Sequence, residues 1–428
     1  MNEKNHNRLH EFRQLKKEIP GSNEHLIVGL DVAKDEHHAF MGNANCKTLL
    51  KKLVFENNLE GFSKLFSRVE AIRAQNALSK VVYAFEPTGN YHKPLQRYLI
   101  EKGCNVVLVT GQAVKNNRET LYGRWDKNDI KDAANVADLV SRGKFLYCDN
   151  PCEGINDLRD LLSLRRRLKK EEHGLKMRIR NNLLTKYFPE LDRFYNTCES
   201  ESLAIVRWCS NPRKIAQMPF DQFFKLVTTS RRGIAQKLRL QKIHALAAQS
   251  IGWPMGLAAD LEASLLVDKL RAVRRQIKDL EQSIEELSMG FGEYKWLLTI
   301  PGFGPYISSK VLATIGDPWR FDNSKQVLRL AGYDLGAYRS GKGSDQVVPV
   351  ISKRGNSEFR YALYQAAFIA STRDRHFIAH FTEMLRGRER ERGIKTKMRV
   401  KLAAKILIIA WTLMKKQEAF NPQYLSVA

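Results

Sequence analysis

The stretch His25-Leu-Ile-Val-Gly-Leu-Asp31 is a short apolar run that ends in a carboxylate. A run of this length and composition is typical of a buried strand. Two further strand-like segments follow it, residues 36–43 and 49–56. The sequence therefore predicts a three-stranded meander that begins with this run.

Two more apolar strands and three helices follow the meander. The strands are residues 80–86, which again end in a carboxylate and are broken by Pro87, and residues 105–110. Apolar residues at helical spacing predict helices, which cover residues 59–76, 91–101 and 129–141. The order βββαβαβα predicts an α/β domain in which helices cover a mixed central sheet.

Four carboxylates of this domain are candidates for one site. Asp31 and Glu86 stand at the C-terminal ends of strands, where α/β sheets usually build their sites. Asp129 and Asp132 are three residues apart and share one face of a helix. Taken singly, each has an ordinary explanation as a turn residue, a surface carboxylate or a helix N-terminus. Together they favour a site for hard divalent cations.

The segments around these carboxylates resemble a known family. They read GLDVAKD around Asp31, FEPTGNYHKPL around Glu86 and DKNDIKDAANVADL around Asp129 and Asp132. This set is similar to the DEDD insertion-sequence transposases, which include the Piv/MooV-type invertases. The resemblance implies a RuvC-like, RNase H-type fold for residues 25–150. It also implies a metal-binding tetrad of Asp31, Glu86, Asp129 and Asp132 for two Mg²⁺ ions, with Mn²⁺ as the alternative ion, and Asp126 competes for the third place.

The overall charge indicates a polyanionic partner. The 428 residues include 71 Lys and Arg against 46 Asp and Glu, which gives a net charge of +25 and a pI near 9.8. Nucleic acid is the commonest partner of such a chain. A membrane partner is not expected, because the apolar run at residues 406–414 is too short to span a bilayer.

Other features of the sequence favour a reducing cytoplasm. The first twenty residues hold no apolar segment of the kind that secretory signals need. The six cysteines form no CxxC pair, and Cys148 and Cys152 are a lone CxxxC. We therefore expect free thiols and no zinc site.

Residues 1–24 are a charged leader. For residues 151–292 the sequence predicts a basic region of helices and coiled coil. Apolar residues between Leu270 and Leu287 fit a heptad-like seam. This seam predicts either an intramolecular hairpin with the helix at residues 155–188 or a dimeric coiled coil. Residues 190–258 are expected to be irregular because Pro212, Pro219 and Pro254 interrupt them.

Residues 293–428 predict a mostly helical domain with two nucleic-acid signals. The first is the segment 297–312, whose Pro-Gly-Phe-Gly-Pro core resembles a helix-hairpin-helix. Gly302 and Gly304 allow a tight turn whose backbone N–H groups can face a phosphate, and Lys310 adds charge. A plain connection between two helices is the alternative, and the second helix should end at Ile315.

The second signal is a pair of glycine-rich, basic segments, residues 330–344 and 350–360. Such loops allow a close approach of the backbone to phosphates. They resemble the C-terminal domain of the same transposase family, in which a serine of the Ser-Gly loop is the nucleophile. By this resemblance the nucleophile is Ser340, with Ser344 as the weaker candidate. The expected phosphate contacts of these segments are Arg339, Lys342, Lys353, Arg354 and Arg360.

Without the resemblance Ser340 would be assigned as a turn residue. A serine hydroxyl needs a base or a metal to become a nucleophile, and no neighbour in the sequence is an obvious base. This predicts a composite site in which the tetrad lies near Ser340, from the same or another protomer.

The last third of the chain has the largest excess of basic residues. Residues 386–405 predict a basic helix or arm that faces phosphates, with a solvated surface as the alternative. The contacts expected there are Arg388, Arg390, Arg392 and Lys395. Residues 403–414 predict a packed terminal helix.

We interpret the chain as a DNA transposase or recombinase that cuts and rejoins strands of its own mobile element. The resemblance also implies a structured guide RNA, the bridge RNA, that pairs with donor and target DNA. Exchange between two duplexes needs at least two active sites, so we expect a dimer or a tetramer. The rivals are a RuvC-like junction endonuclease that uses metal-activated water and a non-catalytic nucleic-acid-binding protein.

Overall fold

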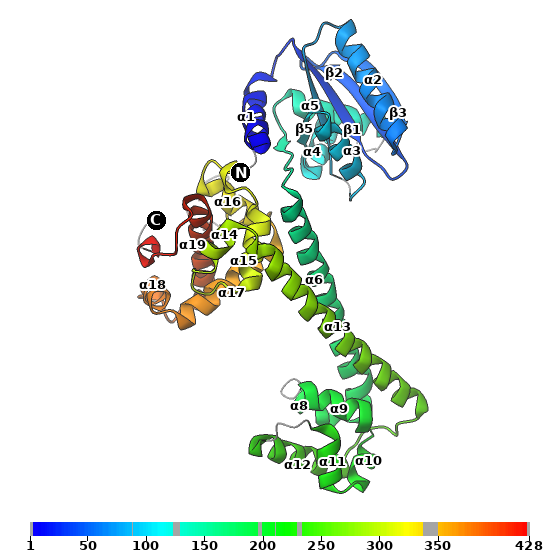
Figure 1. Cartoon of the computed structure of the whole chain (residues 1–428), viewed down its shortest axis with the longest axis vertical. Helices are drawn as coiled ribbons and strands as arrows, with labels where there is room; N and C mark the ends of the chain where they lie inside the picture. Colours follow the sequence, from blue (N-terminus) through cyan, green and yellow to red (C-terminus); the bar gives the residue numbers. More distant parts are fainter. Residues whose placement is uncertain are drawn as a thin grey trace, which may run out of the picture. The chain divides into compact units, whose positions relative to one another are not determined.

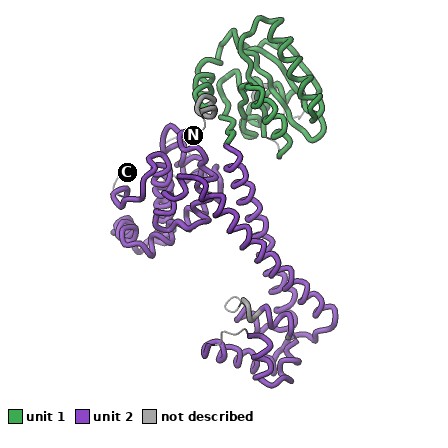
Figure 2. The backbone as a smooth tube through the Cα atoms, viewed as in Figure 1, with its two compact units in different colours: residues 1–151 green, residues 152–428 purple. Residues whose placement is uncertain are grey.

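The computed structural model describes residues 3–87, 89–122, 129–195, 199–209, 211–228, 233–336 and 350–425. The chain divides into two compact units, residues 1–151 and residues 152–428 (Figure 2). Each unit contains two apolar cores of its own.

Unit 1 contains a mixed sheet of six strands in the order β3-β2-β1-β4-β5-β6. The strands are β1 (His25–Asp31), β2 (Glu36–Asn43), β3 (Thr48–Glu56), β4 (Lys80–Phe85), β5 (Asn105–Leu108) and β6 (Leu146–Tyr147). β1 pairs antiparallel with β2 and parallel with β4. The predicted meander is confirmed, because β2 also pairs antiparallel with β3.

The central strand β1 is buried on both faces of the sheet. Leu26, Val28 and Leu30 belong to one apolar core, and Ile27 belongs to the other. A strand covered on both sides needs no polar alternation. This explains why the run from residue 25 to residue 31 is apolar without interruption.

Helices cover both faces of the sheet in unit 1 (Figure 1). Apolar residues of α2 (Leu59–Gln75) and α3 (His92–Glu101) fill one core. Residues of α4 (Gly111–Tyr122) and α5 (Asp129–Ser141) fill the other. The charged leader contains a further helix, α1 (Glu3–Glu18), and Leu15 and Ile19 bury its end in the second core. Helix α4 was not predicted from the sequence.

Unit 2 is mostly helical, and two long helices, α6 (Glu153–Arg178) and α13 (Leu257–Met289), lie side by side in it (Figure 1). Val273 and Ile277 are buried in one core and Ile284 in another, each with residues of α6. Arg165 of α6 also pairs with Glu281 at 2.5 Å. Of the two alternatives for the seam, the structure favours the intramolecular hairpin.

The prediction that residues 190–258 are irregular is wrong. Helices form there instead: α8 (Asp192–Tyr195), α9 (Glu199–Cys209), α10 (Pro212–Gln217), α11 (Phe220–Val227) and α12 (Ile234–Ala248). Two of the three prolines start helices, since Pro212 follows the N-cap Asn211 and Pro219 is the N-cap of α11. Proline is tolerated in a first turn because that N–H has no partner inside the helix.

The C-terminal part of unit 2 packs around its last helix. The helices are α14 (Gly292–Leu297), α15 (Pro305–Ile315), α16 (Ser324–Ala331), α17 (Ser357–Arg373), α18 (Arg375–Leu385) and α19 (Ile394–Lys416). Leu402, Ile406 and Ala410 of α19 are fully buried. The predicted end of α15 at Ile315 and the packed terminal helix are confirmed. No helix within the described ranges is long and apolar enough to cross a membrane.

A buried histidine should make unit 1 sensitive to acid. His37 on β2 is completely buried between the rings of Phe55 and Phe62, and burial lowers its pKa from 6.5. Its Nδ1 accepts a hydrogen bond from the N–H of Ala33, which requires that this nitrogen carry no proton. The unfolded chain therefore binds more protons as the pH falls below 6.5, and the free energy of unfolding should fall with it.

We expect His37→Gln to flatten this dependence. Urea unfolding of wild type and variant at about pH 7.5 and about pH 5.5 measures it, and the drop between the two should be smaller in the variant. The absolute stability of the variant is not the readout, because the substitution also changes packing. Parallel pH profiles would contradict the assignment.

Candidate active site

Three of the four predicted carboxylates line one cavity of unit 1. Asp31 ends β1 and Glu86 directly follows β4, and these paired parallel strands bring both residues to the same edge of the sheet. Asp132 reaches this edge from α5. The cavity has a volume of about 880 Å³ and is also lined by Lys34, Lys115, Arg118 and His38.

The third position of the tetrad is not decided. Asp129 is the first residue of α5, but its side chain lies outside what the structure describes. Its competitor Asp126 lies outside the described residues altogether. The choice between them stays a prediction.

Asp132 has a cationic partner that the sequence did not reveal. Its carboxylate is 2.6 Å from Arg118 Nη2 and accepts a second bond from Arg118 Nε at 2.9 Å. Both side chains are largely buried, with exposed fractions of 7% for Asp132 and 17% for Arg118. Arg118 comes from α4, a helix without a clear periodic pattern in the sequence. The pair forms only when α4 and α5 meet in the fold, so the sequence alone does not predict it.

The donor chemistry of the cavity fits a hard divalent cation. Asp31, Glu86 and Asp132 offer carboxylate oxygens, which are the ligands that Mg²⁺ and Mn²⁺ prefer. Among the described residues, no group of three or more His, Cys, Asp or Glu side chains lies close enough to form a metal site. Cys148 is buried and Cys152 exposed, and the structure places neither of these two cysteines in a disulfide bond.

In unit 2 the structure describes the base of the serine loop. Residues 337–349, with Arg339, Ser340, Lys342 and Ser344, lie outside the described residues. Just before and after them, β7 (Leu335–Gly336) and β8 (Val350–Ile351) pair antiparallel. Ser352 reinforces this pair, because its hydroxyl donates to Asp334 Oδ1 at 2.6 Å and its N–H donates to Asp334 O at 2.8 Å.

Two glycines allow the backbone segments before and after these strands to lie in close contact. A Cβ on Gly355 would lie 2.3 Å from Gly332 N, and a Cβ on Gly332 would lie 2.6 Å from Gly355 N. Gly332 also has a φ of +72°, which favours glycine. The described chain before and after residues 337–349 is therefore held together at this close backbone contact.

Both regions match the same family of known proteins. A DEDD transposase family model matches residues 28–189, and a model of the IS116/IS110/IS902 transposase family matches residues 294–382. Together they cover more than half of the chain. The chain belongs to the IS110 family of DEDD transposases.

Individual relatives extend this match along the whole chain. An insertion element IS116 protein of Streptomyces clavuligerus is 23% identical over 401 residues, which are 93% of this chain and 97% of the relative. The transposase for insertion sequence element IS1111A of Coxiella burnetii is 22% identical over 414 residues, 97% of this chain and 96% of that one. The protein is thus an enzyme, a DNA transposase.

Helices α14 and α15 of the transposase flank the predicted turn, and the structure shows packing contacts for Gly302 and Lys310. Gly302 has a φ of +89°, and a Cβ there would lie 2.4 Å from Ala366 O, so this glycine allows the turn to pack on α17. Gly304 is the N-cap of α15 and faces open space. Lys310 is buried and pairs with Glu358 at 3.2 Å. A phosphate contact of Lys310 stays a prediction and would compete with this ion pair.

The predicted phosphate contacts next to the serine loop differ in exposure. Lys353 and Arg354 are exposed, and Lys353 has a φ of +56°, which is rare for a residue with a side chain. Arg360 is half-buried and donates to Ala331 O at 2.8 Å, so it also stabilises the end of α16.

The basic segment that begins at residue 386 is not one helix. Residues 386–393 form an exposed connection between α18 and α19. Gly387 and Gly393 both have a positive φ, which ends the helical path on either side of Arg388, Arg390 and Arg392. Arg388 pairs with Glu391 at 2.8 Å, and Lys395 stands on the exposed first turn of α19.

The glycine contact at the serine loop can be tested directly. Gly355→Ala should lower the free energy of unfolding of unit 2 by about 1–3 kcal/mol, because its Cβ would overlap backbone atoms of residues 330–332. Gly336→Ala is the matched control, since no atom lies within 4 Å of its Cβ. Chemical unfolding measures both variants. Equal stabilities would show that the contact does not hold the loop base.

Proposed function

We propose that the transposase cuts and rejoins DNA with a divalent-metal tetrad in unit 1 and with Ser340 in unit 2 as the nucleophile. The observation that carries this proposal is the convergence of Asp31, Glu86 and Asp132 on one cavity at the carboxyl edge of the sheet. Asp129 completes the tetrad as the first residue of the helix that carries Asp132.

The tetrad would hold two Mg²⁺ ions. Bound there, the ions would activate the attacking oxygen and stabilise the leaving oxygen in phosphoryl transfer. The protein's own contribution is to hold the carboxylates of the tetrad close together at the edge of the sheet, although they repel each other. Arg118 serves this role in the structure, because it neutralises Asp132 and fixes its orientation with two contacts.

The serine step conserves the energy of the phosphodiester bond. Ser340 Oγ would attack phosphorus, a serine phosphoester would form, and a deoxyribose hydroxyl would leave with a proton. The reverse attack by the hydroxyl of a new strand then rejoins DNA and frees the serine. Arg339 and Lys342 flank Ser340 in the sequence and would hold the phosphate that is cut.

The proposed partners are donor and target double-stranded DNA, a structured guide RNA and further copies of the chain. The net charge of +25 suits either nucleic acid. Two duplexes require at least two active sites, which favours a dimer or a tetramer. The exposed Lys353 and Arg354, and the segment with Arg388, Arg390 and Arg392, are the proposed phosphate contacts.

Alanine at Asp31, Glu86, Asp129 or Asp132 should abolish DNA cleavage and leave DNA affinity within a few fold, because metal binding is separate from the basic surface. Asp35→Ala is the matched control, since Asp35 lines the same cavity outside the tetrad. Gel assays of cleavage and binding with Mg²⁺ test this. Cleavage by Asp129→Ala together with its loss in Asp126→Ala would move the third ligand to Asp126.

Replacing Ser340 separates the recombinase from the junction endonuclease. Denatured reaction mixtures should contain DNA linked to wild-type protein and to Ser344→Ala, but none linked to Ser340→Ala. Denaturing gels with labelled DNA measure this adduct. Normal strand exchange by Ser340→Ala would contradict the assignment and favour hydrolysis by water.

A further inference from the structure

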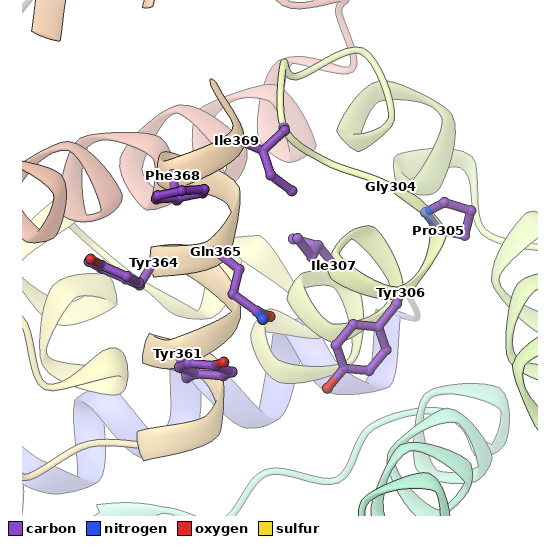
Figure 3. Close-up of a pocket in the computed structure, with 10 residues that line it drawn as sticks. Gly304, Pro305, Tyr306, Ile307, Tyr361, Tyr364, Gln365, Phe368 and Ile369 are labelled. Carbon is purple, nitrogen blue, oxygen red and sulfur yellow. The ribbon is translucent and has the colours of Figure 1, made fainter. Parts of the chain in front are cut away.

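A groove in unit 2 combines aromatic side chains with the predicted phosphate-binding turn. It has a volume of about 560 Å³ and lies between residues 302–307 and one face of α17. Figure 3 shows Tyr361, Tyr364 and Phe368 along α17 on one side of it, with Tyr306 and Ile307 of α15 on the other. A volume of this size lies within the range of small-ligand pockets, roughly 300–1,000 Å³.

The aromatic face of α17 is not used for packing. Tyr361 is 63% exposed and Phe368 is 47% exposed. The opposite face of the same helix carries the buried core residues, among them Leu363, Ala366 and Ala370. Tyr361, Tyr364 and Phe368 follow the i, i+3, i+7 spacing of a single helical face. Large rings kept together in contact with solvent indicate a binding surface.

Two arginines make cation–π contacts with aromatic rings of the groove. The Arg165 guanidinium lies 3.8 Å from the centre of the Tyr306 ring, and that of Arg399 lies 4.6 Å from the centre of the Phe368 ring. None of the described residues that line the groove is acidic. Nearby Glu358 is neutralised by Lys310 and Arg166. Arg165 is also paired with Glu281, whereas no ion pair forms between Arg399 and an acidic side chain among the described residues. Flat apolar rings beside this cation suit a base that carries a phosphate backbone.

The rim of the groove leaves room for that backbone. No atom lies within 4 Å of a Cβ built on Gly304, and this residue lines the groove next to the exposed Pro305 (Figure 3). A strand could therefore approach the main chain at the turn while its bases enter between α15 and α17.

We propose that this groove binds unpaired bases of a single DNA strand, which stack on Tyr361 and Phe368. The occupant follows from the cationic Arg399 beside a groove whose described lining residues include none that is acidic, and from the activity of the chain, because a DNA transposase handles strands freed from a duplex. The inference rests on the DNA transposase activity alone and does not depend on the tetrad or on Ser340.

The test measures binding of a labelled oligothymidine to the full-length protein by fluorescence anisotropy, with a chelator present so that nothing is cut. The double variant Tyr361→Ala/Phe368→Ala should bind about 5- to 100-fold more weakly, the effect of losing one stacked base. The dependence of affinity on salt should stay unchanged, since no phosphate contact is removed.

Matched controls separate stacking from other effects. Tyr361→Phe keeps the ring and should bind like wild type. Trp253→Ala removes an exposed aromatic side chain away from the groove, 69% exposed, and should also bind like wild type. An abasic strand of equal length should bind wild type as weakly as thymidine binds the double variant, and the double variant should lose nothing further. Thermal unfolding checks that the variants are folded.

Three outcomes would overturn the proposal. Equal losses for the thymidine and abasic strands would show that the rings do not contact bases. Tighter binding of oligouridine, with the same loss in the variant, would assign the groove to RNA. Unchanged DNA binding together with weaker self-association in sedimentation would assign it to a second copy of the chain.

Discussion

The proposed active site depends on how closely α5 approaches β1. A Cβ on Gly29 would lie only 2.1 Å from Ala133 O, so glycine is required at this point of the central strand. The residue before Ala133 is Asp132, and the strand ends two residues after Gly29 at Asp31. One backbone contact thus sets the distance between two of the carboxylates. Any side chain at residue 29 would push α5 outward and take Asp132 away from the sheet edge.

Repulsion between carboxylates limits how many of them can lie together at this edge of the sheet in unit 1. Carboxylates gathered around one cavity repel each other unless cations lie between them. Arg118, Lys34 and Lys115 supply positive charge at the cavity in the structure. Because Arg118 already pairs with Asp132 at 2.6 Å, an ion that binds there must share the carboxylate with it or displace it. Arg118 would thus take part in the energetics of the proposed metal binding.

The sequence predicted the parts of this site that local patterns determine. The strand at 25–31 and the helix at 129–141 have the predicted bounds, because an uninterrupted apolar run and a clear apolar stripe mark them. Helix α4 was missed, and Arg118 with it, because the role of Arg118 arises only when two helices meet. The sequence does not predict the helices within 190–258, because proline usually interrupts a helix, whereas Pro212 stands where a helix begins.

In the C-terminal part of unit 2 a glycine again allows a close backbone contact, here with a helix instead of between a helix and a sheet. One face of α17 is made of small and aliphatic residues, so the turn can pack closely on it at Gly302. A Cβ added to Gly302 would lie only 2.4 Å from Ala366 O, which is why this position needs glycine. The next face carries Tyr361 and Phe368, which the core does not need. Because a close backbone contact positions the turn, the groove beside it is already open in this structure. Bases that bind there as proposed would enter a surface formed in advance, which would lower the entropy cost of binding.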